Sequence, residues 1–113
     1  MGVFNGMFPI QPGREDDARA FAAETVGARR AEFEANLARS NITRETWALQ
    51  ETPMGSFMLV WFEGDVEKAF TDLATDDSEY GKWFRARVLD VTGVDLAAPA
   101  GGPPPAVLVD YRA

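Results

Sequence analysis

Two arginines occupy positions in predicted helices where apolar residues are expected. At about 100° per residue, the apolar side chains of residues 14–40 form a stripe, and Arg29 falls near its centre. By the same count, Arg87 falls within the apolar stripe of residues 80–91. A buried guanidinium needs an anionic partner, because an unpaired buried charge costs several kcal/mol.

The partner of each arginine would decide what that arginine does. Glu45, Glu63 and Asp110 lie on predicted strands and are the candidate partners within the chain. A structural ion pair, or a side chain that reaches out to the rim of the layer, is the commoner arrangement. The functional alternative is a pocket between helices and sheet that binds a small anionic or polar ligand.

Aromatic residues supply a second set of candidate binding residues. The set comprises Trp47, Trp61, Trp83, Tyr80 and Tyr111. Together these rings could line a cavity for a planar ligand. Because aromatic residues make up 12% of a small domain, most of them must be buried, and a plain core is the commoner role.

Glu45 is also the candidate general base, if burial raises its pKa toward neutrality. The sequence contains no histidine and no cysteine. This excludes disulfides, thiolate metal sites and the histidine ligands of zinc and haem. The acidic runs at residues 15–17 and 76–77 stand at predicted helix starts, where carboxylates stabilise the helix dipole. We therefore expect neither a metal nor a cofactor.

The overall charge limits the partners of the chain. Eighteen acidic and eleven basic residues give a net charge of −7, which repels nucleic acid and anionic membrane surfaces. No stretch approaches the roughly 18 apolar residues of a membrane helix, and residues 1–10 lack the features of a signal peptide. We expect a cytoplasmic protein that binds neither nucleic acid nor membrane.

The elements that must position these residues follow from periodicity and turn signals. Residues 14–40 are expected to form one long helix, with Gly27 as the place where it would bend. A second helical region is expected in two pieces, residues 65–73 and 80–91, with Ser78 as N-cap and Gly93 as the stop. The expected strands are residues 3–8, 42–51, 56–63 and 106–111, with a turn at 52–55 and an extended connector at 97–105.

This order predicts one α+β domain over residues 1–113 with a ferredoxin-like βαββαβ fold. Such a fold has a four-stranded antiparallel sheet with helices on only one face. In residues 57–62 both alternating sets are apolar, so both faces of the sheet should be covered. We therefore expect a homodimer that forms through the open face of the sheet.

The layout resembles the dimeric α+β barrel superfamily, and within it an uncharacterised bacterial family. The local sequences that carry the resemblance are Pro12-Gly13-Arg14-Glu15, Trp47-Ala48-Leu49-Gln50, the run 57–63, Lys82-Trp83-Phe84, and Gly102-Pro103-Pro104-Pro105 before residues 107–111. Members of the superfamily include cofactor-free monooxygenases, haem-degrading enzymes, lactone isomerases and regulatory ligand-binding domains. The resemblance implies that Asn5, on the first strand, could stabilise an oxyanion. The haem-ligating histidine of the haem-degrading members has no counterpart here.

Three hypotheses follow, and the sequence leaves all of them open, including whether the protein is an enzyme. The first is a homodimer that binds a small molecule in a helix–sheet pocket with Arg29, Arg87 and one or more tryptophans. The second is a cofactor-free monooxygenase or isomerase of a planar substrate, with Asn5 and Glu45 as catalytic residues. The third is a structural dimerisation module without a ligand.

Overall fold

Three antiparallel strands form the sheet, in the order β1-β3-β2, in the computed structural model, which describes residues 2–99 and 101–113. The strands are β1 (Gly2–Pro9), β2 (Arg44–Thr52) and β3 (Gly55–Gly64). Both β1 and β2 pair antiparallel with β3, so they run parallel to each other on its two sides. The predicted hairpin is confirmed, with β2 and β3 joined by a tight turn.

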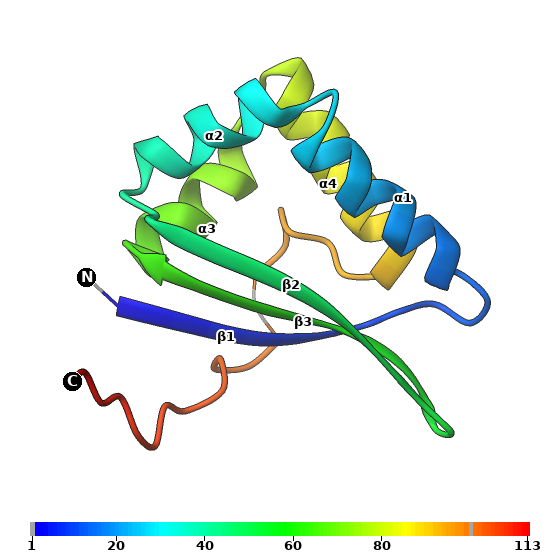
Figure 1. The fold of residues 1–113 in the computed structure, drawn as a ribbon. Helices are drawn as coiled ribbons and strands as arrows, with labels where there is room; N and C mark the ends of the chain where they lie inside the picture. Colours follow the sequence, from blue (N-terminus) through cyan, green and yellow to red (C-terminus); the bar gives the residue numbers. More distant parts are fainter. Residues whose placement is uncertain (1, 100) are drawn as a thin grey trace.

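Four helices cover one face of this sheet and leave the other face without helices (Figure 1). They are α1 (Glu15–Val26), α2 (Arg30–Arg39), α3 (Val66–Thr75) and α4 (Glu79–Thr92). Ser78 caps α4 as predicted, because its hydroxyl accepts a hydrogen bond from the backbone N–H of Gly81 at 3.1 Å. Gly93 ends α4 in the left-handed conformation, with φ of 78°. The α+β class is thus confirmed.

The single long helix predicted over residues 14–40 is two helices that meet at an angle (Figure 1). The chain leaves helical geometry at Gly27, where φ is −108° and ψ is −101°. A Cβ atom at this position would lie 2.7 Å from the backbone oxygen of Ala23, so only glycine fits the observed path. The glycine therefore ends α1 instead of bending a continuous helix.

The fourth strand predicted over residues 106–111 is not present, which corrects the expectation of a four-stranded sheet. These residues have no regular secondary structure and no ladder pairing, and they are exposed, with Leu108 at 91%. Val107, Leu108 and Val109 are apolar in succession, so a strand here would need cover on both faces. In the part of the chain that the structure describes, no second layer supplies that cover. The segment instead crosses to the side of the sheet away from the helices (Figure 1).

The two faces of the sheet differ in what covers them. Alternate residues of β3 point in opposite directions, as predicted: Met58 and Phe62 lie buried beneath the helices, whereas Leu59 on the other face is 38% exposed. Among the described residues, no helix is both long and apolar enough to cross a bilayer.

Candidate functional site

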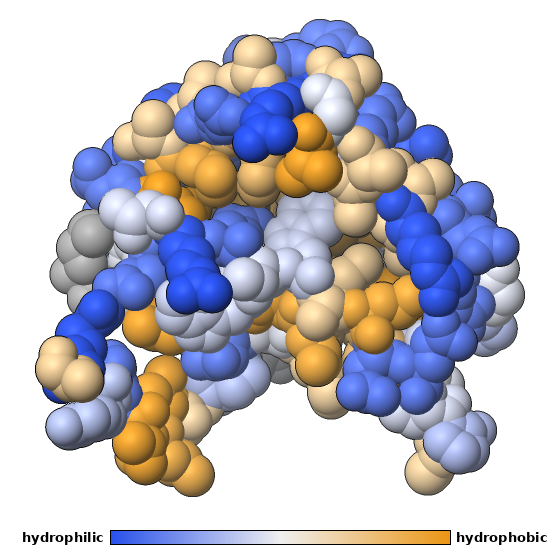
Figure 2. All heavy atoms as spheres, in the orientation of Figure 1, coloured by the Kyte–Doolittle hydropathy of each residue, from blue (hydrophilic) through white to orange (hydrophobic). Residues whose placement is uncertain are grey.

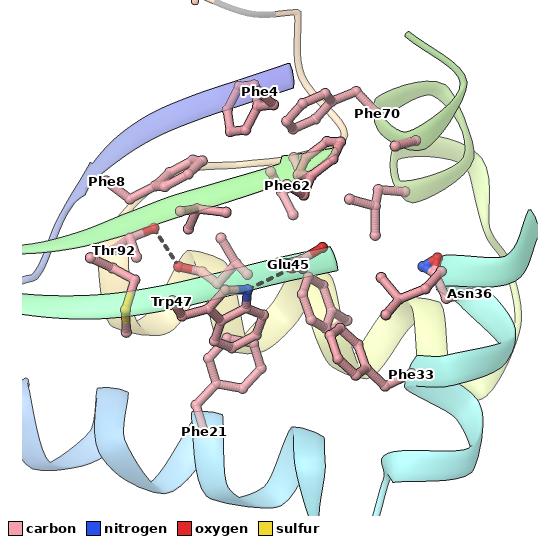
Figure 3. A pocket seen from close by; sticks show the side chains of 18 of the residues that line it. Phe4, Phe8, Phe21, Phe33, Asn36, Glu45, Trp47, Phe62, Phe70 and Thr92 are labelled. Carbon is pink, nitrogen blue, oxygen red and sulfur yellow. Dashed lines mark hydrogen bonds between the residues drawn. The ribbon is translucent and has the colours of Figure 1, made fainter. Parts of the chain in front are cut away.

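A cavity of about 90 Å³ lies between the helices and the covered face of the sheet (Figure 3). Every helix and strand contributes at least one aromatic ring to its walls. These rings are Phe4 and Phe8 of β1, Trp47 of β2, Phe62 of β3, Phe21 of α1, Phe33 of α2, Phe70 of α3, and Tyr80 and Phe84 of α4. In the space-filling view, hydrophobic side chains gather in the band between helices and sheet, where the surface is hollowed (Figure 2). The cavity is thus apolar and reachable from solvent.

Gly6 makes room for two of these rings on β1. It points toward the helices between Phe4 and Phe8, which lie on the same side of the strand. A Cβ atom on Gly6 would lie 2.6 Å from the Phe4 ring and 2.9 Å from the Phe8 ring. The missing side chain therefore lets both rings fold over the strand at the floor of the cavity.

Glu45 is the acidic group of the cavity wall. It lies opposite Phe62 in the register of β2 and β3, so the strand turns it toward the helices. Two residues later on the same face, Trp47 donates its indole Nε1–H to Glu45 Oε2 at 2.6 Å (Figure 3). Burial raises the pKa of Glu45, and the hydrogen bond from Trp47 opposes that shift. The sequence predicted both residues as site candidates, and the structure brings them into direct contact.

Tyr80 places a phenol in the same cavity. It is only 4% exposed, and its hydroxyl has no hydrogen-bond partner within residues 2–99 and 101–113. Burial raises the pKa of Tyr80 well above its ordinary value, and the nearby charge of Glu45 adds to the shift. The hydroxyl is therefore a neutral, desolvated group that needs an acceptor.

Asn36 is a polar lining residue that the sequence analysis did not single out. Its amide reaches into the cavity from α2 (Figure 3). It stands three residues after Phe33 and next to Leu37, two members of the apolar stripe that predicted this helix. An amide on the stripe was the signal that could have identified it. Thr92 also lines the wall, but its hydroxyl donates to the Val88 carbonyl at 2.6 Å.

Arg29 is not among the cavity-lining residues, and its partners differ from those proposed. It precedes α2, and its guanidinium lies 2.5 Å from Glu79, with Glu24 and Glu32 within 3.7 Å. It also stacks over the Trp83 ring, 4.4 Å from the centroid. The predicted strand partners are wrong, because the break after Gly27 carries Arg29 to the start of α4. Helix carboxylates there hold it in place.

Arg87 also lies outside the residues that line the cavity. Its side chain is half-exposed on α4, with Nη1 at 3.8 Å from Asp90 of the same helix. Asp90 accepts shorter hydrogen bonds from Arg14, so it is shared between two arginines. Arg87 Nε is buried and has no hydrogen-bond partner in the described part of the chain. Strand carboxylates do not reach Arg87, contrary to the expectation.

The third tryptophan of the chain, Trp83 on α4, packs behind the cavity wall. Trp83 lies 5.7 Å from Tyr80 and 5.5 Å from Phe21, measured between ring centroids. It is absent from the lining itself. Trp83 therefore supports two residues of the wall from outside.

Asn5 and Trp61 lie together on the open face of the sheet, far from this cavity. They are direct cross-strand neighbours, and a shallow hollow there is completed by residues of the C-terminal segment, including Val107 and Tyr111. Glu45 lies opposite Phe62, the next residue after Trp61, and so points to the other face. The structure therefore does not bring the proposed catalytic pair, Asn5 and Glu45, into one site.

Comparisons of the chain with protein-family models, with curated proteins and with solved structures gave no match. The resemblance to the dimeric α+β barrel superfamily thus stays a prediction, and the geometry of the cavity is the basis for any function.

Proposed function

We propose that this protein binds a small, mostly apolar molecule in the cavity between the helices and the sheet. The observation that carries the proposal is a cavity with many aromatic residues in its wall, into which the described residues also place a carboxyl group, an amide and an unpartnered phenol. Ligand sites of proteins have this composition, with apolar walls and a few placed polar groups. A structural module without a ligand has no need of an open cavity in its core.

Of the anionic and the aromatic ligand that the sequence predicted, the cavity fits the anionic one poorly. No lysine or arginine of residues 2–99 and 101–113 lines the cavity. Arg29, the nearest candidate, is already neutralised by Glu79, Glu24 and Glu32. An anion entering beside Glu45 would meet a like charge in a medium of low dielectric constant, which opposes binding. Of the two ligand classes predicted, the aromatic one is favoured.

The enzyme hypothesis has less support from the geometry. A monooxygenase or isomerase of the proposed kind would need an oxyanion donor and a base at one reacting centre. Asn5 and Glu45 lie on opposite faces of the sheet. We therefore rank binding without catalysis first.

We also propose that the protein forms a homodimer through the open face of the sheet, as in the ferredoxin-like dimers it resembles. The strand order supports the ferredoxin-like fold. β1 and β2 run parallel to each other with β3 between them, as in a split βαβ unit. Exposed apolar side chains on that face support the dimer, with Met7 62% exposed.

Ligand binding can be tested through the three tryptophans, which give separate indole N–H signals in a ¹⁵N-correlated NMR spectrum. Adding toluene or phenol is expected to shift the signal of Trp47, which lines the cavity, and not that of Trp61, which lies on the other face. No shift of the Trp47 signal with either probe would contradict the proposal.

A pair of variants locates the binding site. Ala69 is buried in the cavity wall, so Ala69→Leu fills the space and is expected to weaken binding by about tenfold or more. Ala48→Leu adds the same atoms on the open face and should leave binding unchanged. Equal affinity of both variants for toluene would place the site elsewhere.

A further inference from the structure

The polar groups of the cavity have unused hydrogen-bonding capacity. Glu45 Oε2 accepts the indole N–H of Trp47, which leaves Oε1 to accept from another donor. Tyr80 contacts the aromatic cluster against which Trp47 packs, and its buried hydroxyl has no partner among the described residues. A buried hydroxyl without a partner is costly, so a bound group that satisfies it would gain affinity.

A hydroxyl group matches both capacities. It can donate its hydrogen to Glu45 and accept the hydrogen of Tyr80, because a hydroxyl has one donor and two acceptor lone pairs. An ammonium group only donates, which leaves the Tyr80 hydroxyl without an acceptor. A carboxylate only accepts, and it would bring a second negative charge to Glu45.

The size of the cavity limits the rest of the molecule. Its volume of about 90 Å³ is below the roughly 150 Å³ of an apolar protein cavity that holds benzene. The hollowed surface lets a ring enter partly and keeps one edge near solvent (Figure 2). Without rearrangement of the walls, a single ring is therefore held only in part, and larger apolar bodies are excluded.

Resting on the proposed function, we infer that the cavity selects a neutral, single-ring molecule with a hydroxyl group, of which phenol is the simplest example. The aromatic walls hold the ring, and Glu45 and Tyr80 bind the hydroxyl. In this arrangement Trp47 keeps its hydrogen bond to Glu45, and the Tyr80 hydroxyl stays neutral.

Four probes of equal ring size test the inference at neutral pH: phenol, toluene, benzoate and benzylammonium. The Trp47 indole signal measures binding of each one. Phenol is expected to bind about tenfold more tightly than toluene, the gain typical of hydrogen bonds to buried groups. Benzoate and benzylammonium are expected to bind more weakly than phenol.

Two tyrosines give a matched pair of variants, since the chain has only these two. Tyr80→Phe removes one oxygen from the cavity and should weaken the binding of phenol several-fold while leaving the affinity for toluene unchanged, since the hydrogen bond from phenol to Glu45 remains. Tyr111→Phe removes the same oxygen from the exposed C-terminal segment and should change neither affinity. Glu45→Gln is expected to weaken phenol binding several-fold, because hydrogen bonds to an ionised acceptor are the stronger ones.

The outcomes separate this inference from the proposed function. If toluene binds as tightly as phenol, or if Tyr80→Phe leaves the affinity for phenol unchanged, the hydroxyl selection is wrong while the cavity remains a binding site. If benzylammonium binds most tightly, the site selects a cation instead. If none of the four probes moves the Trp47 signal, the proposed function itself fails.

Discussion

The alternation of side chains along β2 points the carboxyl group of Glu45 into an apolar cavity. The protonation of Glu45 is therefore linked to the free energy of unfolding. Burial raises its pKa in the folded protein, which then holds the proton more tightly than the unfolded chain does. The stability gained from this proton is fully present below the unfolded pKa of about 4.3 and is lost as the pH rises through the raised folded pKa.

Glu45→Gln is therefore expected to be more stable than the wild type at pH 7, with the difference vanishing below about pH 4. The glutamine is neutral throughout and its oxygen can still accept the Trp47 hydrogen bond. Urea unfolding at several pH values measures the difference. Glu51→Gln serves as control, because Glu51 is exposed on the same strand and bonds to Arg19. A wild type more stable than Glu45→Gln at pH 7 would show that the carboxylate is stabilising.

The sequence predicts the position of a site residue correctly where that position depends on a single strand. Period-two alternation puts Glu45 and Trp47 on the same face, and the structure finds them hydrogen-bonded there. Arg29 depended on the phase of a helix over many residues, and the break at Gly27 changed that phase. The partner of such a residue follows from how two helices pack, which periodicity does not encode.

At the scale of elements, the turn after α1 depends on one glycine. Gly27→Ala would bring its Cβ to 2.7 Å from the Ala23 carbonyl oxygen, a backbone atom that cannot move without disturbing α1. We expect a loss of about 1–3 kcal/mol in the free energy of unfolding, measured by urea denaturation with circular dichroism.

Gly102→Ala is the matched control for this glycine. A Cβ atom at Gly102 has no heavy atom within 4 Å, so the expected change is within about 0.5 kcal/mol. Equal unfolding midpoints for Gly27→Ala and the wild type would show that the helices can close into one.

Local signals predicted the hairpin and the caps at Ser78 and Gly93, because turn and cap residues act within a few positions of themselves. Residues 106–111 carry an equally strong local preference for strand, yet they are unpaired. Strand formation needs a neighbour and cover on each apolar face, and neither is contained in local sequence. The cavity was not predicted, because it is the space left between aromatic side chains from all seven elements and by the absent side chain of Gly6.

At the scale of the molecule, the open face of the sheet differs in charge from the rest of the chain. The net charge is −7, but the strand residues on this face include one cation and one anion, Arg44 and Glu63, which lie opposite each other. Two copies could thus approach through this face with little repulsion. The C-terminal segment covers the end near Val3 and Trp61 and leaves Met7 and Leu59 exposed at the other end.

A dimer through this face should therefore depend on Leu59, which lies on the central strand between Met7 and Ala48. In a symmetric dimer, Leu59→Glu would bury one negative charge in the interface from each subunit. We therefore expect the wild type to be a dimer and the variant a monomer in sedimentation equilibrium. Leu89→Glu places the same charge on an exposed leucine of α4 and should remain dimeric. A monomeric wild type at tens of micromolar would refute the dimer. If both variants are monomers, the interface includes part of the helical surface as well, because a charge at Leu89 would then also disrupt it.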